Sequence, residues 1–571
     1  MATPRAKRKS AVRRKAAKAL RSDDGSSGPE AHGQAPTSPP EAGLSAGKTA
    51  PGKEQPAVTA QALALRQREI SVSEFFTKNR HLLGFDNPGR ALLATVKEAV
   101  DNSLDACQEA HILPDLLVEV RQIEENRFRV IVQDNGPGIV RHQIPKIFGK
   151  LLYGSKFHTL KQSRGQQGIG ISAAGMYGQL TTGKPVSITS CSRPGRPAHY
   201  YEIQLDTERN QPIVLKEAEV EWKSDGCGTR VEIELEGRYQ KGRHSVDAYL
   251  QQMVLANPHV EVQYLPPKGD PMRFPRVVDA MPPDPKEIRP HPYGVELGLL
   301  QGMLKSAKGQ RLSGFLCGSF SRVSRPTALE ICSKAGLKPE TKAHLVVGEE
   351  VERLFRAIGQ TKIMAPPTNC LSPIGEEIIL RSLREQVQGD FFTARTRPPV
   401  VYRGNPFLVE VGLAYGGNLP ADEPIALHRF ANRVPLLFQQ SACAITDAVL
   451  RIDWKSYGLS QNRGALPGGP AVLLVHVASV WVPFTSESKE AVADYEEIVR
   501  EIRLALQECG RQMGRFVQRR KREAEAERKR SYIEKYIPYI GEALQEILDL
   551  RPDRRSLLEE NLKNMLERSR S

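Results

Sequence analysis

Three polar side chains are spaced so that one face of a helix would present them together. Glu98, Asn102 and Asp105 stand at positions i, i+4 and i+7, and such positions share one side of an α-helix. An acid and an amide would then be aimed at the same place, as proton transfer beside a bound ligand requires. A solvated polar face is the ordinary explanation of this spacing in an isolated helix, so the neighbouring sequence has to distinguish the two.

The helix that would position these groups is predicted to run from Ala91 to Ala110. Its apolar residues recur with helical spacing on a different face. This apolar stripe consists of Leu93, Val96, Val100 and Leu104. The stripe is therefore expected to pack against a core and to leave the polar face free.

A turn with two glycines follows a predicted strand further along the chain. The strand is expected over residues 128–133, and Asp134-Asn135-Gly136-Pro137-Gly138 comes directly after it. Glycines let another group approach the backbone closely, so Asp134 is a candidate to bind a planar base through an exocyclic amine. The same residue types also form ordinary turns.

A glycine-rich loop then leads into a predicted helix of small residues. The loop consists of Arg164, Gly165, Gln166, Gln167, Gly168, Ile169, Gly170 and Ile171. Glycine N–H groups can close on phosphate oxygens, and a helix N-terminus adds a favourable dipole. The loop lacks the Gly-Lys-Ser/Thr ending of a P-loop and is not the dinucleotide fingerprint of a βαβ unit.

In this order, the helix, the turn and the loop resemble the Bergerat nucleotide-binding fold of the superfamily that holds gyrase, the ninety-kilodalton heat-shock chaperones, histidine kinases and MutL. The resemblance implies ATP and Mg²⁺ as cofactors. It assigns Glu98 as general base for the attacking water, Asn102 as Mg²⁺ ligand and Asp134 as partner of the adenine amino group. It also implies nucleotide contacts from Asp105, Gly136, Gly138, residues 164–171 and Thr229.

Further motifs resemble the B subunit of type IIB topoisomerases, the topoisomerase VI family, over about residues 71–510. One of them is Tyr153-Gly154-Ser155-Lys156, and in that family the Ser-Lys pair contacts the nucleotide. Residues 291–325 resemble the family's helix-two-turn-helix insertion, and residues 454–490 resemble its transducer domain.

The family's switch lysine lies in the loop before the last long helix and reaches the γ-phosphate. The resemblance places it at Lys489 as a catalytic residue, with Lys455, beside Trp454 on a predicted strand, as the second choice. A surface lysine without such a role is the alternative for both positions.

The predicted fold class is α+β. We expect a disordered basic tail over 1–58, a Bergerat α/β sandwich ATPase domain with an N-terminal strap over 59–236, a linker and small helical helix-two-turn-helix domain over 237–368, an α/β transducer domain over 369–510, and a charged helical extension over 511–571. Strands are predicted at residues 117–120, 128–133, 186–190, 200–205, 229–235, 400–402 and 471–480. A long helix is expected from near Ser488 and a further one over residues 532–550, and the helices of residues 290–359 are expected to break at Gly314, Gly336 and Gly348.

Charge and cysteine content narrow the class of protein. The formal net charge of +15 suggests a polyanionic partner, but nine Lys or Arg and no acid lie between Met1 and Arg21. That tail is either a nucleic-acid arm or nuclear address, or merely a solubilising segment.

The eight cysteines form no CxxC pair, which favours reduced thiols. Without a signal peptide or an apolar run of about 18 residues, an intracellular protein of a prokaryotic cytoplasm or nucleoid is expected.

The resemblance implies an ATP-hydrolysing subunit of a DNA topoisomerase, an isomerase that changes DNA topology. Its partners would be a DNA-cleaving A subunit, in a heterotetramer of two A and two B chains, double-stranded DNA, and a second B chain on ATP binding, with no membrane. One alternative is a clamp or chaperone of the MutL or heat-shock type on the same fold. Another is a binding protein with an inactive ATPase site, against which the intact Glu98, Asn102 and glycine loop argue.

Overall fold

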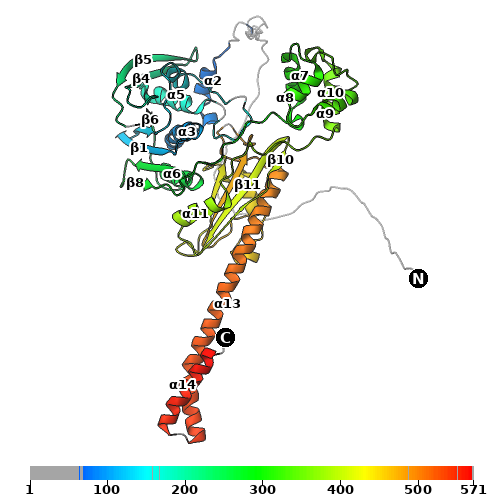
Figure 1. Cartoon of the computed structure of the whole chain (residues 1–571). Coiled ribbons are helices and arrows are strands. Elements are labelled where there is room, and N and C mark those ends of the chain that lie inside the picture. Colours follow the sequence, from blue (N-terminus) through cyan, green and yellow to red (C-terminus); the bar gives the residue numbers. More distant parts are fainter. Residues whose placement is uncertain are drawn as a thin grey trace, which may run out of the picture. The chain divides into compact units, whose positions relative to one another are not determined.

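The computed structural model describes residue 64 and residues 69–156, 159–165, 168–224, 226–486, 488–549 and 551–568. The predicted basic tail, residues 1–58, and the loop residues Gln166 and Gln167 lie outside these ranges. Along the described chain a sheet with helices comes first, a helical group second, and another sheet with a long helix third (Figure 1). The predicted α+β class is confirmed.

The first region is built on an eight-stranded sheet in the order β5-β4-β3-β6-β2-β1-β7-β8. Neighbouring strands are antiparallel, except that β7 runs parallel to β1. The strands are β1 (Asp115–Glu124), β2 (Arg127–Gln133), β3 (Val186–Cys191), β4 (Ala198–Asp206), β5 (Gln211–Val220), β6 (Gly228–Glu236), β7 (Glu261–Leu265) and β8 (Met272–Phe274).

Helices of the first region share the core of this sheet on one of its faces (Figure 1). The longest are α3 (Pro88–Glu109), α5 (Gly170–Thr182) and α6 (Val246–Ala256). Two shorter helices, α2 (Val72–Lys78) and α4 (Ile144–Gly149), accompany them.

Local sequence explains where α3 begins and which face it buries. The Asn87 side chain accepts a hydrogen bond from the Arg90 backbone N–H at 2.9 Å, and Pro88 occupies the first turn. The predicted apolar stripe is buried, namely Leu93, Val96, Val100 and Leu104. Since burial of each such side chain contributes roughly 1.5–3 kcal/mol, the stripe holds the opposite, polar face in a fixed direction.

The first region differs from the prediction in two places. The predicted strands 117–120, 128–133, 186–190, 200–205 and 229–235 are all present, but β5 was missed, because its side chains are mostly exposed and show no apolar alternation. The sheet also continues past the boundary predicted at residue 236, through α6, β7 and β8 to Phe274. The parallel pairing of β7 with β1 joins distant segments, which local periodicity does not reveal.

The second region is a group of helices with a core of its own. It contains α7 (Leu297–Ser306), α8 (Leu312–Ser319), α9 (Arg325–Ala335) and α10 (Glu349–Gln360). Gly336 ends α9 and Gly348 precedes α10 as predicted, both with positive φ. The break predicted at Gly314 is wrong, because α8 continues through it. Its neighbours Phe315 and Leu316 are buried, and that packing outweighs glycine's helical cost of about 1 kcal/mol.

The third region holds a six-stranded sheet between two layers of helices. Its strands are β9 (Phe391–Thr396), β10 (Val400–Tyr402), β11 (Asn405–Tyr415), β12 (Ala426–Ala431), β13 (Val434–Pro435) and β14 (Ala471–Ser479). All residues of β14 are buried, as expected for a strand covered on both faces. Helix α11 (Glu376–Gln386) shares one core with this sheet, and α12 (Ala444–Leu450) and the long helix share another.

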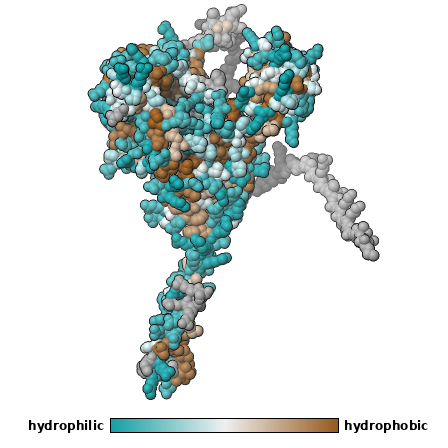
Figure 2. Space-filling model, in the orientation of Figure 1, coloured by the Kyte–Doolittle hydropathy of each residue, from teal (hydrophilic) through white to brown (hydrophobic). Residues whose placement is uncertain are grey.

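The long helix α13 runs without a break from Glu496 to Leu548. The prediction placed its start near Ser488 and a separate helix over residues 532–550; the structure has one helix that begins later and absorbs both. Helix α14 (Pro552–Arg568) packs against its C-terminal part, where Arg555 donates to Gln545 Oε1 at 3.4 Å. Exposed apolar side chains gather there (Figure 2), among them Ile533, Ile540, Ile547 and Met565. None of the described helices is long and apolar enough to span a bilayer.

Candidate functional site

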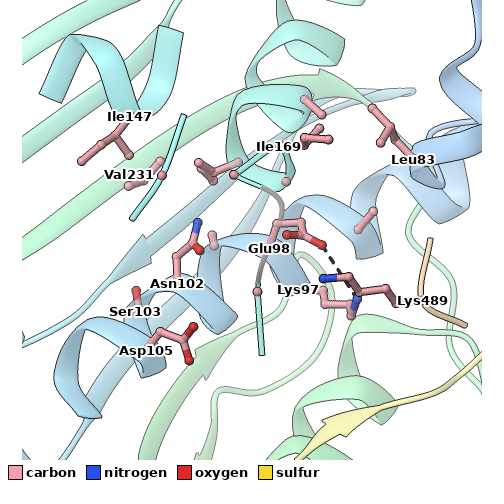
Figure 3. A pocket seen from close by; sticks show the side chains of 18 of the residues that line it. Leu83, Lys97, Glu98, Asn102, Ser103, Asp105, Ile147, Ile169, Val231 and Lys489 are labelled. Carbon is pink, nitrogen blue, oxygen red and sulfur yellow. Dashed lines mark ion pairs between the residues drawn. The ribbon is translucent and has the colours of Figure 1, made fainter. Parts of the chain in front are cut away.

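A cavity of about 620 Å³ lies between segments that are far apart in the sequence. Its walls come from α3, the turn after β2, the segment before α5, and β6, with two loops from the third region. In Figure 3, Glu98 and Asn102 project from α3 into this space while Lys489 enters from the loop before α13. The cavity therefore joins the first sheet to the third region.

The polar face of α3 lines this cavity along its length. Glu98, Asn102 and Asp105 all belong to the wall, and Asn102 is exposed. The same wall includes other residues singled out from the sequence, namely Asp134, Gly138, Ser155, Lys156, Gly165, Gly168, Ile169, Gly170, Ile171 and Thr229. Gly136 and Arg164 are outside it, and Gln166 and Gln167 lie outside the described residues.

Glu98 lies against the first turn of α5. A Cβ atom on Gly170 would stand 1.7 Å from Glu98 Oε2, so only glycine leaves room for this carboxylate. Lys97 Nζ is 3.8 Å from Glu98 Oε1, and Lys489 approaches the same side chain (Figure 3). The Glu98 carboxylate thus lies beside a helix N-terminus and two cations, surroundings that would also accommodate the negative charge of a polyphosphate.

Asp134 is a buried carboxylate held by three hydrogen bonds at the other end of the cavity. Ser103 Oγ donates to Oδ2 at 2.8 Å, and the backbone N–H groups of Gly136 and Thr229 donate to Oδ1 at 2.9 and 3.1 Å. Burial raises the pKa of Asp134, although these three donors oppose the shift. Gly136 therefore serves to position Asp134 and does not line the cavity. The carboxylate is oriented to receive a donor such as an exocyclic amine.

Position 138 requires a glycine, both because of its backbone conformation and because a side chain would have no room there. Its φ is +69°, and a Cβ atom there would lie 2.0 Å from the Cys191 carbonyl oxygen. We expect Gly138→Ala to lower the free energy of unfolding by roughly 2–5 kcal/mol, since the left-handed conformation costs about 1–2 kcal/mol and overpacking about 1–3 kcal/mol. Urea unfolding would measure this. Gly183→Ala is the matched control, with φ of +70° and nothing within 4 Å, and an equal loss in both variants would contradict the steric argument.

Lys156 and Arg164, two cations close to the cavity, are paired with acids within the protein. Lys156 Nζ lies 2.6 Å from Asp105 Oδ2 and 2.9 Å from Glu109 Oε1. Arg164 points away from the cavity, with contacts to Asp105 at 2.8 Å and to Asn257 at 2.7 Å. Burial alone would raise the pKa of Asp105, but Lys156 and Arg164 outweigh it and hold that pKa below its usual value. The side chain of Arg164, predicted to bind nucleotide, instead supports α3 from behind.

The two lysines proposed for the switch role have different surroundings. Lys489 lines the cavity from a strained position with φ of 54°, and burial lowers its pKa while Glu98 opposes that shift. Lys455 is exposed and outside the cavity wall. The strand predicted around Trp454 is wrong: Trp454–Tyr457 forms a 3₁₀ helix with Trp454 buried.

Several residues of the cavity were missed by sequence reasoning. Arg90 forms an ion pair with Glu490 and stacks over the Phe438 ring with its guanidinium carbon 4.8 Å from the centroid. Phe438 comes from a third-region loop without a recognisable motif, whereas Glu490 ends the stretch that resembles the transducer but was given no role there. Ser103 directly follows Asn102 in the predicted helix. The helical spacing of that segment could therefore have shown on which side of the helix Ser103 lies.

The fold and the site define the class of protein. A helix face with an acid and an amide, a glycine turn holding a buried Asp, and a glycine loop on a mixed sheet are the elements of a Bergerat-type ATPase domain. Residues 88–238 match the family described as "Histidine kinase-, DNA gyrase B-, and HSP90-like ATPase". Residues 366–529 match "Topoisomerase VI B subunit, transducer".

Relatives then identify the particular family. The B subunit of type 2 DNA topoisomerase 6 from Methanococcoides burtonii is 50% identical over 491 residues, which cover 86% of this chain and 79% of that protein. Its namesake in Archaeoglobus fulgidus is 48% identical over 488 residues, which cover 85% and 81%. The chain belongs to the family of type 2 DNA topoisomerase 6 B subunits, and the alternative of a MutL-type or heat-shock-type protein is set aside.

Structural likeness to solved proteins is weaker. The ATPase region of Saccharomyces cerevisiae topoisomerase II aligns with a TM-score of 0.39 and 11% identity, over 78% of this chain and 100% of that one. A likeness of this strength supports no conclusion about this chain.

Proposed function

We propose that the chain binds ATP with Mg²⁺ in the cavity beside α3 and hydrolyses it, with Glu98 as general base. The observation that carries the proposal is convergence: Glu98 and Asn102 from α3 and Lys489 from the third region line one cavity whose other end holds Asp134. A carboxylate within reach of a water in line with the γ-phosphate can accept its proton. The N–H groups of the loop at residues 165–171 would hold the phosphates.

The polar groups of the cavity fit a magnesium nucleotide. Mg²⁺ prefers oxygen ligands and is usually held by one or two protein groups together with phosphate oxygens and waters. Asn102 presents an exposed amide in this wall, and we assign it as the protein ligand. Among the described residues no cluster of three His, Cys, Asp or Glu could hold a metal without the nucleotide, which suits an ion that arrives with ATP. Bound Mg²⁺ would neutralise charge on the phosphates.

Asp134 would select the base. We expect Asp134→Asn to weaken ATP affinity about 10- to 100-fold, because a hydrogen bond to a charged group contributes about 1.5–3 kcal/mol and 1.4 kcal/mol is a factor of ten. Fluorescent ATP-analogue titration would measure it, with GTP as competitor. Asp115→Asn is the matched control, since Asp115 is half exposed on β1 and outside the cavity. An unchanged affinity would remove Asp134 from adenine recognition.

The ATPase domain is proposed to extend from the strap to Phe274, followed by the helix-two-turn-helix domain, the transducer and the C-terminal helical extension. Lys489 would connect the ATPase domain to the transducer. It lies seven residues before α13 begins at Glu496, so a contact between Lys489 and the γ-phosphate would act close to the N-terminus of that helix. Loss of the γ-phosphate would release the contact and shift the transducer.

The partners proposed are those that the family name implies. The chain would dimerise on ATP binding and associate with a DNA-cleaving A subunit as a heterotetramer of two A and two B chains. Double-stranded DNA would be its macromolecular substrate. The supporting observations are the family membership and the match to a B-subunit transducer.

Reconstitution tests this function directly. The chain would be purified with a candidate A subunit and assayed for relaxation of supercoiled DNA with ATP, with a non-hydrolysable ATP analogue, and without nucleotide. We expect relaxation only with both subunits and ATP. ATP hydrolysis by the chain without any relaxation in the complex would contradict the topoisomerase role, and absence of hydrolysis in both preparations would contradict the ATPase assignment.

A further inference from the structure

Arg433 is a buried arginine without an acidic partner among the described residues. It is 4% exposed; its side chain donates to the Pro373 carbonyl oxygen at 2.9 Å, while its Nε has no hydrogen-bond partner within the described ranges. Burial lowers the pKa of Arg433 to about 10, with help from the nearby Arg164 and against the opposing effect of the buried Glu410. Glu410 forms no ion pair with Arg433, and its carboxylate is hydrogen-bonded instead to His476 and to the backbone N–H groups of Ile374 and Gly375. A buried charge is normally paired, because desolvation costs several kcal/mol, so Arg433 calls for a counter-charge in direct contact with its guanidinium group, which no described residue supplies.

The backbone at Arg433 is also unfavourable for this residue type. Asn432 and Arg433 form the two-residue turn between β12 and β13, with φ of 49° and 67°. Such turns favour Asn followed by Gly, and the left-handed conformation costs a non-glycine residue roughly 1–2 kcal/mol. An arginine that is both strained and buried without an acid is a feature typical of functional sites.

Arg433 borders a second cavity of about 180 Å³, on the far side of α3's Asp105 from the nucleotide cavity. Four cations face it, namely Lys156, Lys161, Arg164 and Arg433. Three acids face it too, namely Asp105, Glu109 and Asp284. Asp105 and Glu109 contact Lys156, and Asp284 lies 3.2 Å from the His111 imidazole, which carries a charge only when it is protonated. No such pair is found for Lys161 or Arg433 in the described part of the chain.

The pKa values of two neighbouring histidines are lowered by burial and by the same positive charges. Burial lowers the pKa of His259 to about 2, and Arg433, Arg164 and Arg276 add to that shift. Burial also lowers the pKa of His476, whose Nε2 accepts the Arg433 backbone N–H at 3.0 Å. Both imidazoles are therefore neutral near pH 7, and neither adds a charge that would change the excess of cations.

We propose that this cavity binds a small tetrahedral oxyanion between Arg164 and Arg433, and that the anion is the inorganic phosphate released from ATP. Asp105 and Lys156 line both cavities, so the two are neighbours. The cavity is large enough for an oxyanion with several waters, and guanidinium groups bind phosphate oxygens in paired hydrogen bonds. The source of the anion rests on the proposed ATP hydrolysis, whereas the anion site rests on Arg433 and its surroundings.

A phosphate at this place would connect the nucleotide loop to the transducer. Arg164 opens the glycine loop, and Arg433 belongs to the transducer hairpin. The two segments already touch, since Asn432 Nδ2 donates to the Ser163 carbonyl oxygen at 2.9 Å and Asn257 joins Arg164 to the Arg433 carbonyl oxygen at 2.7 and 3.2 Å. Phosphate between the guanidinium groups would strengthen this contact, and its departure would weaken it.

Equilibrium dialysis with radiolabelled inorganic phosphate tests the site in the full chain. The protein would be saturated with a non-hydrolysable ATP analogue, which occupies the γ-phosphate position. We expect one phosphate per chain to bind under this condition, and Arg433→Met to reduce its affinity at least tenfold. Arg451→Met is the matched control, because Arg451 is a half-exposed transducer arginine paired with Asp447. Sulfate should compete with the phosphate, and chloride at equal ionic strength should not.

The outcomes separate this proposal from the proposed ATPase function. Phosphate binding that disappears when the analogue is bound, or that is equal in Arg433→Met and wild type, would overturn the second site. Failure of the analogue itself to bind would count against the ATPase assignment, and phosphate binding without analogue would then decide the anion site alone. Urea unfolding controls for folding: Arg433→Met should be no less stable than Arg451→Met, because it removes a buried unpaired charge.

Discussion

Glu98→Gln is expected to reduce ATP turnover by about 10²–10⁴-fold, the usual contribution of general base catalysis, while ATP still binds. Glutamine keeps the shape of the side chain in the space that Gly170 leaves for it, but it cannot accept the proton of the attacking water. The loss should therefore fall on kcat with little change in the affinity for ATP. A substitution that merely disturbed the cavity would instead weaken binding.

Steady-state hydrolysis and analogue titration together measure these two quantities. Glu124→Gln is a suitable control, since it changes the same residue type at an exposed position of β1 that pairs with Arg127. Turnover in Glu98→Gln that matches the control would remove Glu98 from the role of base. Lost affinity with unchanged kcat would make it a binding residue.

The parts of the site that sequence alone could predict are those held within one continuous segment. The face of α3 follows from helical spacing, because Glu98, Asn102 and Asp105 are positioned by the same buried stripe. The Asp134 turn follows from a strand that ends at Gln133 and from glycines after it. In each case the local sequence determines the backbone geometry, and the backbone geometry determines where the functional side chains point.

The parts that sequence could not predict depend on distant segments. Arg164 lies in a glycine loop, yet its side chain is drawn to Asp105 and Asn257 and away from the cavity, and no local pattern contains Asn257. The parallel β7 extends the sheet through pairing with β1. The Arg433 turn sits between two short strands, and its neighbour Asn432 contacts the first region at Ser163.

Lys489→Met is expected to slow ATP hydrolysis on the order of 10³-fold or more, the contribution typical of a cation that stabilises the transferring phosphoryl group. Methionine retains most of the length and apolar stem of lysine but lacks the charge. Because burial already lowers the pKa of Lys489, removal of that charge should not reduce the free energy of unfolding. A lower rate with an unchanged urea midpoint would thus reflect catalysis and not folding.

Matched lysine variants determine whether the effect belongs to this residue. Lys455→Met should hydrolyse ATP at the wild-type rate, since Lys455 is exposed and outside the cavity. Lys97 is the stronger rival, because its Nζ lies 3.8 Å from Glu98 and it lines the same wall. If Lys97→Met lost the 10³-fold factor and Lys489→Met did not, the essential cation would come from α3, and the transducer would have no direct contact through which to detect the γ-phosphate.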